Sequence, residues 1–248
     1  MSDRRKVLVV TVGTSALTAE KLGKGWSGQD AMLKSRNRYL EEKDSDRPQK
    51  EKDDGLFHQV VKAHRHNLNR KFHRSFAIDP LMSSAEMASM ALLLLEVGGL
   101  PGLFDATRDR MVLITSDTEE GKFCARVNAR LLHEYLTKCR CGETFQKWEA
   151  TCPAILLRYV KGMEAKKEFV ETQPALATIL QEFTQGKTDY FYNITGGYKG
   201  AIPALTWIAV QDFPGPMFYL HASNDSAVRV DIHSVTGVKE IRLRPMAP

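Results

Sequence analysis

The 248-residue sequence predicts one α/β domain, residues 1–248, with a doubly wound, mainly parallel sheet flanked by helices. Two observations predict this class. Short β-branched runs, such as VLVVTV at 7–12, are typical of strands that are buried on both faces of a parallel sheet. Stretches with apolar residues at helical spacing alternate with these runs, as at 119–139.

The other elements follow in chain order. Ser83 and Glu86 form a capping-box pair that predicts a helix start, and Gly98 and Gly99 predict its end. The C-terminal stretches read as strands that complete the sheet. We expect strands at 7–12, 111–115, 154–160, 189–194, 217–222, 227–233 and 239–244, and helices at 84–97, 119–139, 165–183 and 198–211.

The basic charge of the chain is local. The whole sequence carries a net charge of +5, whereas residues 21–75 hold 14 Lys or Arg and 8 Asp or Glu, a net of +6. Within this segment, 40–54 is a charged run that predicts a mobile insert loop after the first strand. Residues 56–74 have helical apolar spacing. The segment is interpreted either as a solvated helix face or as a positive rim for a polyanion.

Several protein classes are not expected. The charged N-terminal residues do not resemble a secretory signal, and the apolar run at 91–95 is far too short to span a membrane. Cys139 and Cys141 form a lone C-x-C without a second pair at zinc spacing. We therefore expect a cytoplasmic protein with reduced thiols, no bound metal and no cofactor.

Gly- and hydroxyl-rich loops follow three of the expected strands. Because ligands bind beyond the carboxyl ends of strands in such sheets, these loops are the candidate site. Their backbones can approach an anion closely, and Lys199 adds a full charge at the start of a helix, where a cation is unfavourable unless an anion is near. The candidate residues are Gly13, Thr14, Ser15, Ser116, Asp117, Thr118, Thr195, Gly196, Gly197, Tyr198 and Lys199.

Each loop taken alone is weak support for a site. The glycines are equally explained by turn geometry, and Asp117 is expected to cap the following helix. No G-x-G-x-x-G directly follows one of the expected strands, and G-x-x-x-x-G-K-[ST] does not occur in the sequence, which argues against an ordinary dinucleotide enzyme or a P-loop nucleotidase.

The segments VLVVTVGTS, LITSDTEEG and NITGGYKGAIPALT together resemble the CRISPR-associated Rossmann-fold (CARF) family, most closely its stand-alone ring nucleases. The resemblance implies a Rossmann-like homodimer that binds cyclic oligoadenylate across its two-fold axis, with cyclic tetra-adenylate as the favoured ring and no role for DNA or a membrane. It implies Lys199 and Ser15 as catalytic residues. It implies the other candidate residues as ligand-binding.

The resemblance leaves two functions open. A ring nuclease would cleave the ring without metal through the ribose 2′-OH and switch off an antiviral response. A non-catalytic sensor would instead pass the signal to a separate effector. We favour the nuclease because the expected single domain leaves no room for an effector module. Arg126 and His133 match a ribonuclease spacing only formally, and no strong general base is evident. An unrelated nucleotide-binding enzyme is the third alternative.

Overall fold

The computed structural model describes residues 4–14, 16, 57, 60–61, 64, 84, 86–87, 89–90, 107–140, 154–161, 169–197, 201–220, 227–235 and 238–245. The insert predicted at 40–54 and most of the basic segment 21–75 lie outside the described residues. Within the described ranges, no helix combines the length and apolar character that crossing a membrane requires.

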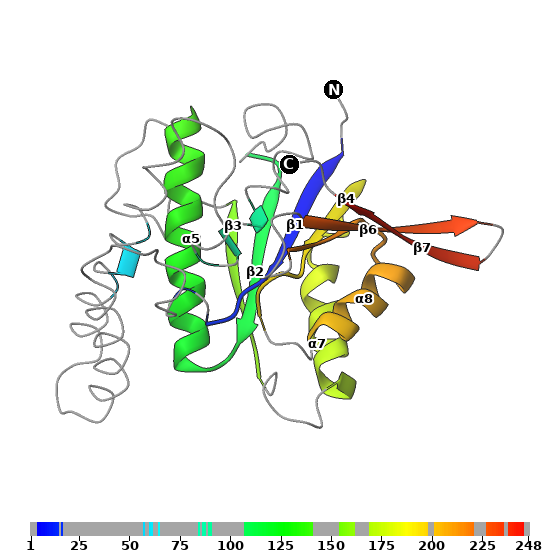
Figure 1. The fold of residues 1–248 in the computed structure, drawn as a ribbon, viewed down its shortest axis with the longest axis horizontal. Helices are drawn as coiled ribbons and strands as arrows, with labels where there is room; N and C mark the ends of the chain where they lie inside the picture. Colours follow the sequence, from blue (N-terminus) through cyan, green and yellow to red (C-terminus); the bar gives the residue numbers. More distant parts are fainter. Residues whose placement is uncertain are drawn as a thin grey trace.

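A seven-stranded sheet in the order β3-β2-β1-β4-β5-β6-β7 forms the centre of the described part of the chain (Figure 1). The first five strands in this order are parallel, and the last two pair antiparallel. The predicted doubly wound, mainly parallel fold is therefore confirmed. The strands are β1 (Arg5–Thr11), β2 (Arg110–Ser116), β3 (Ile155–Val160), β4 (Thr188–Asn193), β5 (Met217–Leu220), β6 (Ala227–Val235) and β7 (Val238–Pro245).

Strand β1 lies at the centre of the parallel part. Its Val9 is opposite Val112 of β2 on one side and Tyr192 of β4 on the other. Residues 7–11 are all buried, because both faces of this strand are covered. Continuous burial explains the unbroken β-branched run in the sequence.

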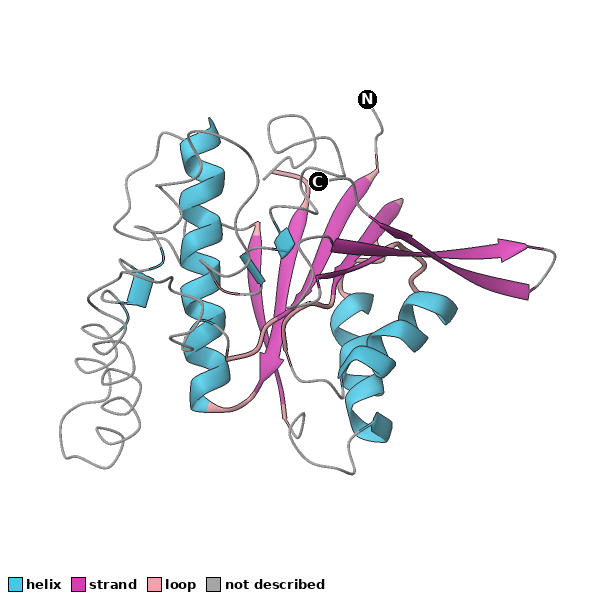
Figure 2. Cartoon of the chain, in the orientation of Figure 1, coloured by secondary structure: helices cyan, strands magenta, loops and turns pink. Residues whose placement is uncertain are grey.

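Among the described residues, three long helices lie against the sheet. They are α5 (Glu119–Arg140), α7 (Phe169–Gln181) and α8 (Ala201–Gln211), and Figure 1 shows α5 on one side of the strands and α7 and α8 together on the other. One core joins apolar side chains of α7 and α8 to alternate residues of the central strands, including Val7 and Val9. Figure 2 shows the β6–β7 pair extending beyond these layers.

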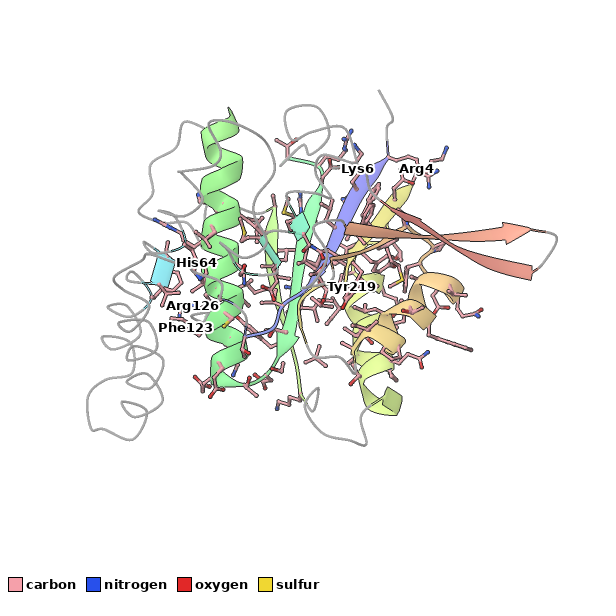
Figure 3. All side chains as sticks on the ribbon, viewed as in Figure 1. Arg4, Lys6, His64, Phe123, Arg126 and Tyr219 are labelled. Carbon is pink, nitrogen blue, oxygen red and sulfur yellow. The ribbon has the colours of Figure 1, made fainter. Side chains whose placement is uncertain are left out.

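Helix α5 also packs against Phe57, which lies between β1 and β2 in the sequence. The Phe123 ring meets the Phe57 ring edge-on at a centroid distance of 6.1 Å, and the Arg126 guanidinium lies 5.3 Å from the centroid of the same Phe57 ring. Figure 3 labels Phe123 and Arg126 on α5. His133, also on α5, is buried. Arg126 and His133 both lie on α5, the helix that the sequence predicts for them.

Candidate functional site

Loops leave β1, β2 and β4 at the carboxyl edge of the sheet. They are the β1 loop (residues 12–14 and 16), the β2 loop (116–118) and the β4 loop (194–197). Because the three strands are parallel and adjacent, the loops lie side by side at one edge, as predicted. Chain order reverses between β1 and β4, so the β1 and β4 loops flank the switch point where such sheets bind ligands.

The β1 and β4 loops touch through their glycines. A Cβ atom added to Gly13 would lie 2.8 Å from the backbone nitrogen of Gly197. Gly197 has a φ of 91°, and a Cβ there would lie 2.8 Å from Thr11 Cβ. Both distances are closer than side chains allow, so these glycines are required for the two loops to meet. Loop packing alone therefore accounts for them.

A buried carboxylate lies against both loops. Glu86, whose exposed fraction is 1%, accepts a hydrogen bond from the Gly13 N–H at 2.8 Å through Oε1. A Cβ on Gly196 would lie 2.5 Å from Glu86 Cδ and nearer still to Oε1. The sequence pattern predicts only a capping role for Glu86. Its Oε1 reaches the β1 loop, and Ser84 Oγ accepts the Met87 N–H at 3.2 Å in the manner of an N-cap, whereas the predicted capping partner Ser83 lies outside the described residues.

Buried polar side chains connect the same helical segment to β4. Ser89 Oγ donates to Asn193 Oδ1 at 2.9 Å, and Asn193 Nδ2 lies 2.7 Å from the Ser89 hydroxyl. Asn193 Oδ1 also accepts the Thr195 N–H at 3.2 Å, which shapes the start of the β4 loop. The Thr11 hydroxyl donates to the Gly196 carbonyl. The β4 loop is therefore held by groups from β1, β4 and the segment around Ser89.

The β2 loop starts α5 differently from the prediction. Thr118 Oγ1 accepts the Gly121 N–H at 3.1 Å, so Thr118 is the N-cap and the prediction for Asp117 was wrong. The Asp117 carboxylate instead pairs with Lys122 Nζ at 2.6 Å. The hydrogen bond to Lys122 lowers the pKa of Asp117, and the same bond raises the pKa of Lys122. Asp117 is thus a solvent-accessible anion at this end of the sheet.

A buried histidine contacts the end of the β1 loop. His64 Nε2 lies 2.8 Å from the Ala16 carbonyl oxygen, to which it donates, and both residues are fully buried. His64 Nδ1 has no hydrogen-bond partner among the described residues. Burial lowers the pKa of His64, partly opposed by the bond to Ala16, which favours the neutral ring.

Of the candidate residues, the structure packs Gly13 against Gly197 and Gly196 against Glu86, and Thr14, which follows Gly13, is exposed. Ser116 Oγ and Thr118 Oγ1 are 3.0 Å apart in the β2 loop. Ser15, Tyr198 and Lys199 lie outside the described residues. In the part of the chain that the structure describes, no three His, Cys, Asp or Glu side chains are grouped to hold a metal ion.

The model of a family of CRISPR-associated proteins (Cas_APE2256) matches residues 82–231, more than half of the chain. The chain belongs to this CRISPR-associated family. No curated protein matches the sequence.

The matched region of this CRISPR-associated chain includes the residues that sequence reasoning missed. Glu86, Ser89 and Asn193 all lie within it and are all at most 2% exposed. A signal for Glu86 is present in the sequence, because a carboxylate in the apolar stretch AEMASMALLLL must be buried or displaced from the core. However, the residues that Glu86 contacts, Gly13 and Gly196, are distant in the sequence, so the sequence alone does not identify them.

Proposed function

We propose that this CRISPR-associated chain binds cyclic oligoadenylate, with cyclic tetra-adenylate as the favoured ring, at the carboxyl edge of its sheet and cleaves it without metal. The observation that carries the proposal is the meeting of the β1 and β4 loops at the switch point of a doubly wound sheet. The resemblance to ring nucleases and the CRISPR-associated family support the choice of ligand.

The proposed reaction uses a nucleophile that the ligand carries. A ribose 2′-oxygen attacks the adjacent phosphorus and loses its proton, while the bond from phosphorus to the 5′-oxygen breaks and that oxygen gains a proton. The product is a linear oligoadenylate with a 2′,3′-cyclic phosphate and a 5′-hydroxyl. The protein mainly needs to hold the 2′-oxygen in line with the leaving oxygen.

Two proposed catalytic residues serve this geometry. Lys199, with backbone N–H groups near Gly196 and Gly197, stabilises the charge that builds on the phosphate, and one well-placed donor contributes about 3–4 kcal/mol. Ser15 orients the 2′-hydroxyl or the phosphate. A homodimer would present two identical rims to a ring with even symmetry, so we propose a two-fold pair as the active form.

The test is a cleavage assay with cyclic tetra-adenylate and cyclic hexa-adenylate in EDTA, with the linear products followed by chromatography. Wild type should open at least one ring, and Lys199→Ala should lower the rate by about 10²-fold or more. Lys187→Ala is the matched control, because Lys187 is exposed and precedes β4 at the opposite edge of the sheet. It should cleave as wild type does.

Three results would contradict the proposal in different ways. Tight binding of a ring without opening would favour a sensor that signals to a separate effector. Equal cleavage by Lys199→Ala and wild type would refute the catalytic assignment. Binding of a dinucleotide with no affinity for either ring would refute the ligand class itself.

A further inference from the structure

The helical segment containing residues 84, 86–87 and 89–90 contacts the candidate site at two points. Glu86 accepts the Gly13 N–H of the β1 loop, and Ser89, one helical turn further on, bonds Asn193 at the end of β4. Ser84 donates to Asn128 Oδ1 of α5 at 2.6 Å, which anchors the segment to the helix that follows the β2 loop. One segment therefore links the elements around all three loops.

Glu86 is the residue of this segment that contacts both the β1 loop and the β4 loop. Its carboxylate is a charged acceptor, so its bond to Gly13 is stronger than a bond between neutral groups. The same carboxyl group fills the space beside Gly196 that a side chain would occupy. With an exposed fraction of 1%, Glu86 is buried, so its effect on a ligand would pass through the loops that it contacts.

We propose that Glu86 is a positioning residue whose carboxylate sets the spacing between the β1 loop and the β4 loop. The consequence for catalysis rests on the function proposed above. Gly13 precedes Thr14 and the proposed catalytic Ser15, whereas Gly196 precedes the N–H of Gly197. A shift of Gly13 relative to Gly196 would therefore move Ser15 away from the Gly197 N–H.

The Gly13 N–H, which donates to Glu86, is not available as a hydrogen-bond donor to a phosphate. Because this N–H already donates to Glu86 at 2.8 Å, anion binding at the switch point falls to other groups, foremost the β4 loop and the residues after it. The Glu86 carboxylate is therefore bonded to a backbone donor of the β1 loop, beside the site proposed to bind anions.

Two conservative variants separate the effect of the length of the Glu86 side chain from the effect of its charge. Glu86→Gln keeps the length and one acceptor oxygen but removes the charge, whereas Glu86→Asp keeps the charge and is shorter by one methylene. Positioning predicts that Glu86→Gln keeps kcat within about threefold of wild type. Glu86→Asp should lower kcat by about 10- to 100-fold at similar KM, since misplacement by about 1 Å costs up to about 10²-fold.

Met87→Ala is the control for a loss of packing. Met87 is buried on the same segment, and its truncation lowers stability without changing the Glu86 contact. It should therefore leave kcat near wild type when assayed well below its Tm. If Glu86→Gln loses activity and Glu86→Asp keeps it, or if both keep it, the positioning role is refuted.

Hydrogen exchange of the Gly13 amide tests the contact without any ligand. In wild type and Glu86→Gln this amide should exchange slowly, and in Glu86→Asp at least about tenfold faster, with the Val9 amide unchanged as an internal reference. An unchanged Gly13 rate in Glu86→Asp would overturn the proposal. If wild type cleaves no ring but the exchange pattern holds, the proposed function fails and the positioning contact stands.

Discussion

The Gly196–Glu86 contact predicts a specific energetic coupling. The three atoms nearest to a Cβ on Gly196 all belong to the Glu86 side chain, and two of them, Cδ and Cγ, would lie 2.5 and 2.6 Å away. Gly196→Ala must therefore displace the carboxylate and break its bond to the Gly13 N–H. Gly196 does not have a positive φ, so the substitution adds no left-handed backbone strain.

The cost of Gly196→Ala can be worked out from these contacts. Losing a hydrogen bond to a charged group costs about 1.5–3 kcal/mol. Overpacking at a buried site adds about 1–3 kcal/mol. The reduced freedom of the unfolded chain returns about 0.4–1 kcal/mol. The expected loss of unfolding free energy is therefore about 3 kcal/mol.

The same substitution should cost little when the Glu86 side chain is truncated. In a Glu86→Ala background the three nearest atoms are removed and the Gly13 bond is already lost, so Gly196→Ala should change stability by less than about 1 kcal/mol. Urea unfolding of the four proteins measures the difference. The expected coupling energy is about 2–3 kcal/mol, well above the scatter between independent sites.

Gly186→Ala provides the control for this cycle. Gly186 has a φ of 88°, and a Cβ atom added there would meet no atom within 4 Å, so Ala at this position costs backbone strain alone, about 1–2 kcal/mol. That cost should be the same with and without the Glu86 side chain. A coupling between Gly196 and Glu86 below about 0.5 kcal/mol would refute the contact on which the positioning role depends.

Two further predictions concern the β2 loop and His64. Thr118→Ala should lower the unfolding free energy by about 1 kcal/mol through loss of the α5 cap, whereas Thr118→Ser should retain most of it, and equal losses in urea would contradict the cap assignment. Burial lowers the pKa of His64, so the unfolded state binds more protons and wild type should lose stability as the pH falls below about 6.5. His64→Gln keeps an N–H for the Ala16 carbonyl but does not titrate, so its Tm should fall less between pH values of about 7.5 and about 5.5, and parallel profiles would refute this account.

The strands and helices were predictable because their signals are local. The run at 7–12 and the periodicity of 119–139 depend on neighbouring residues, and β1 and α5 begin and end within two residues of the expected positions. The meeting of the loops at one edge followed from strand order, since parallel neighbours share an edge.

The site contacts were not predictable in the same way. Glu86 and Gly13 are separated by 73 positions, and Ser89 and Asn193 by 104, so no local pattern pairs them. Glu86 also lies three positions after Ser83, as a capping box requires, but Ser83 lies outside the described residues. For the α5 cap, Asp117 and Thr118 are both good N-cap residues, and only the helix start at Glu119 decides between them.

The glycines of the site require a different kind of test from the charged residues. Gly13, Gly196 and Gly197 are each needed to let protein atoms approach, whether or not a ligand binds. A loss of activity in Gly13→Ala or Gly197→Ala would follow from separated loops, and it would not show that the glycine contacts a phosphate. Lys199 and Ser15 carry the chemical part of the proposal, whereas Glu86 and the glycines carry its geometry. Activity lost in Lys199→Ala with unchanged unfolding free energy and an unchanged Gly13 amide would therefore assign the lysine to the ligand.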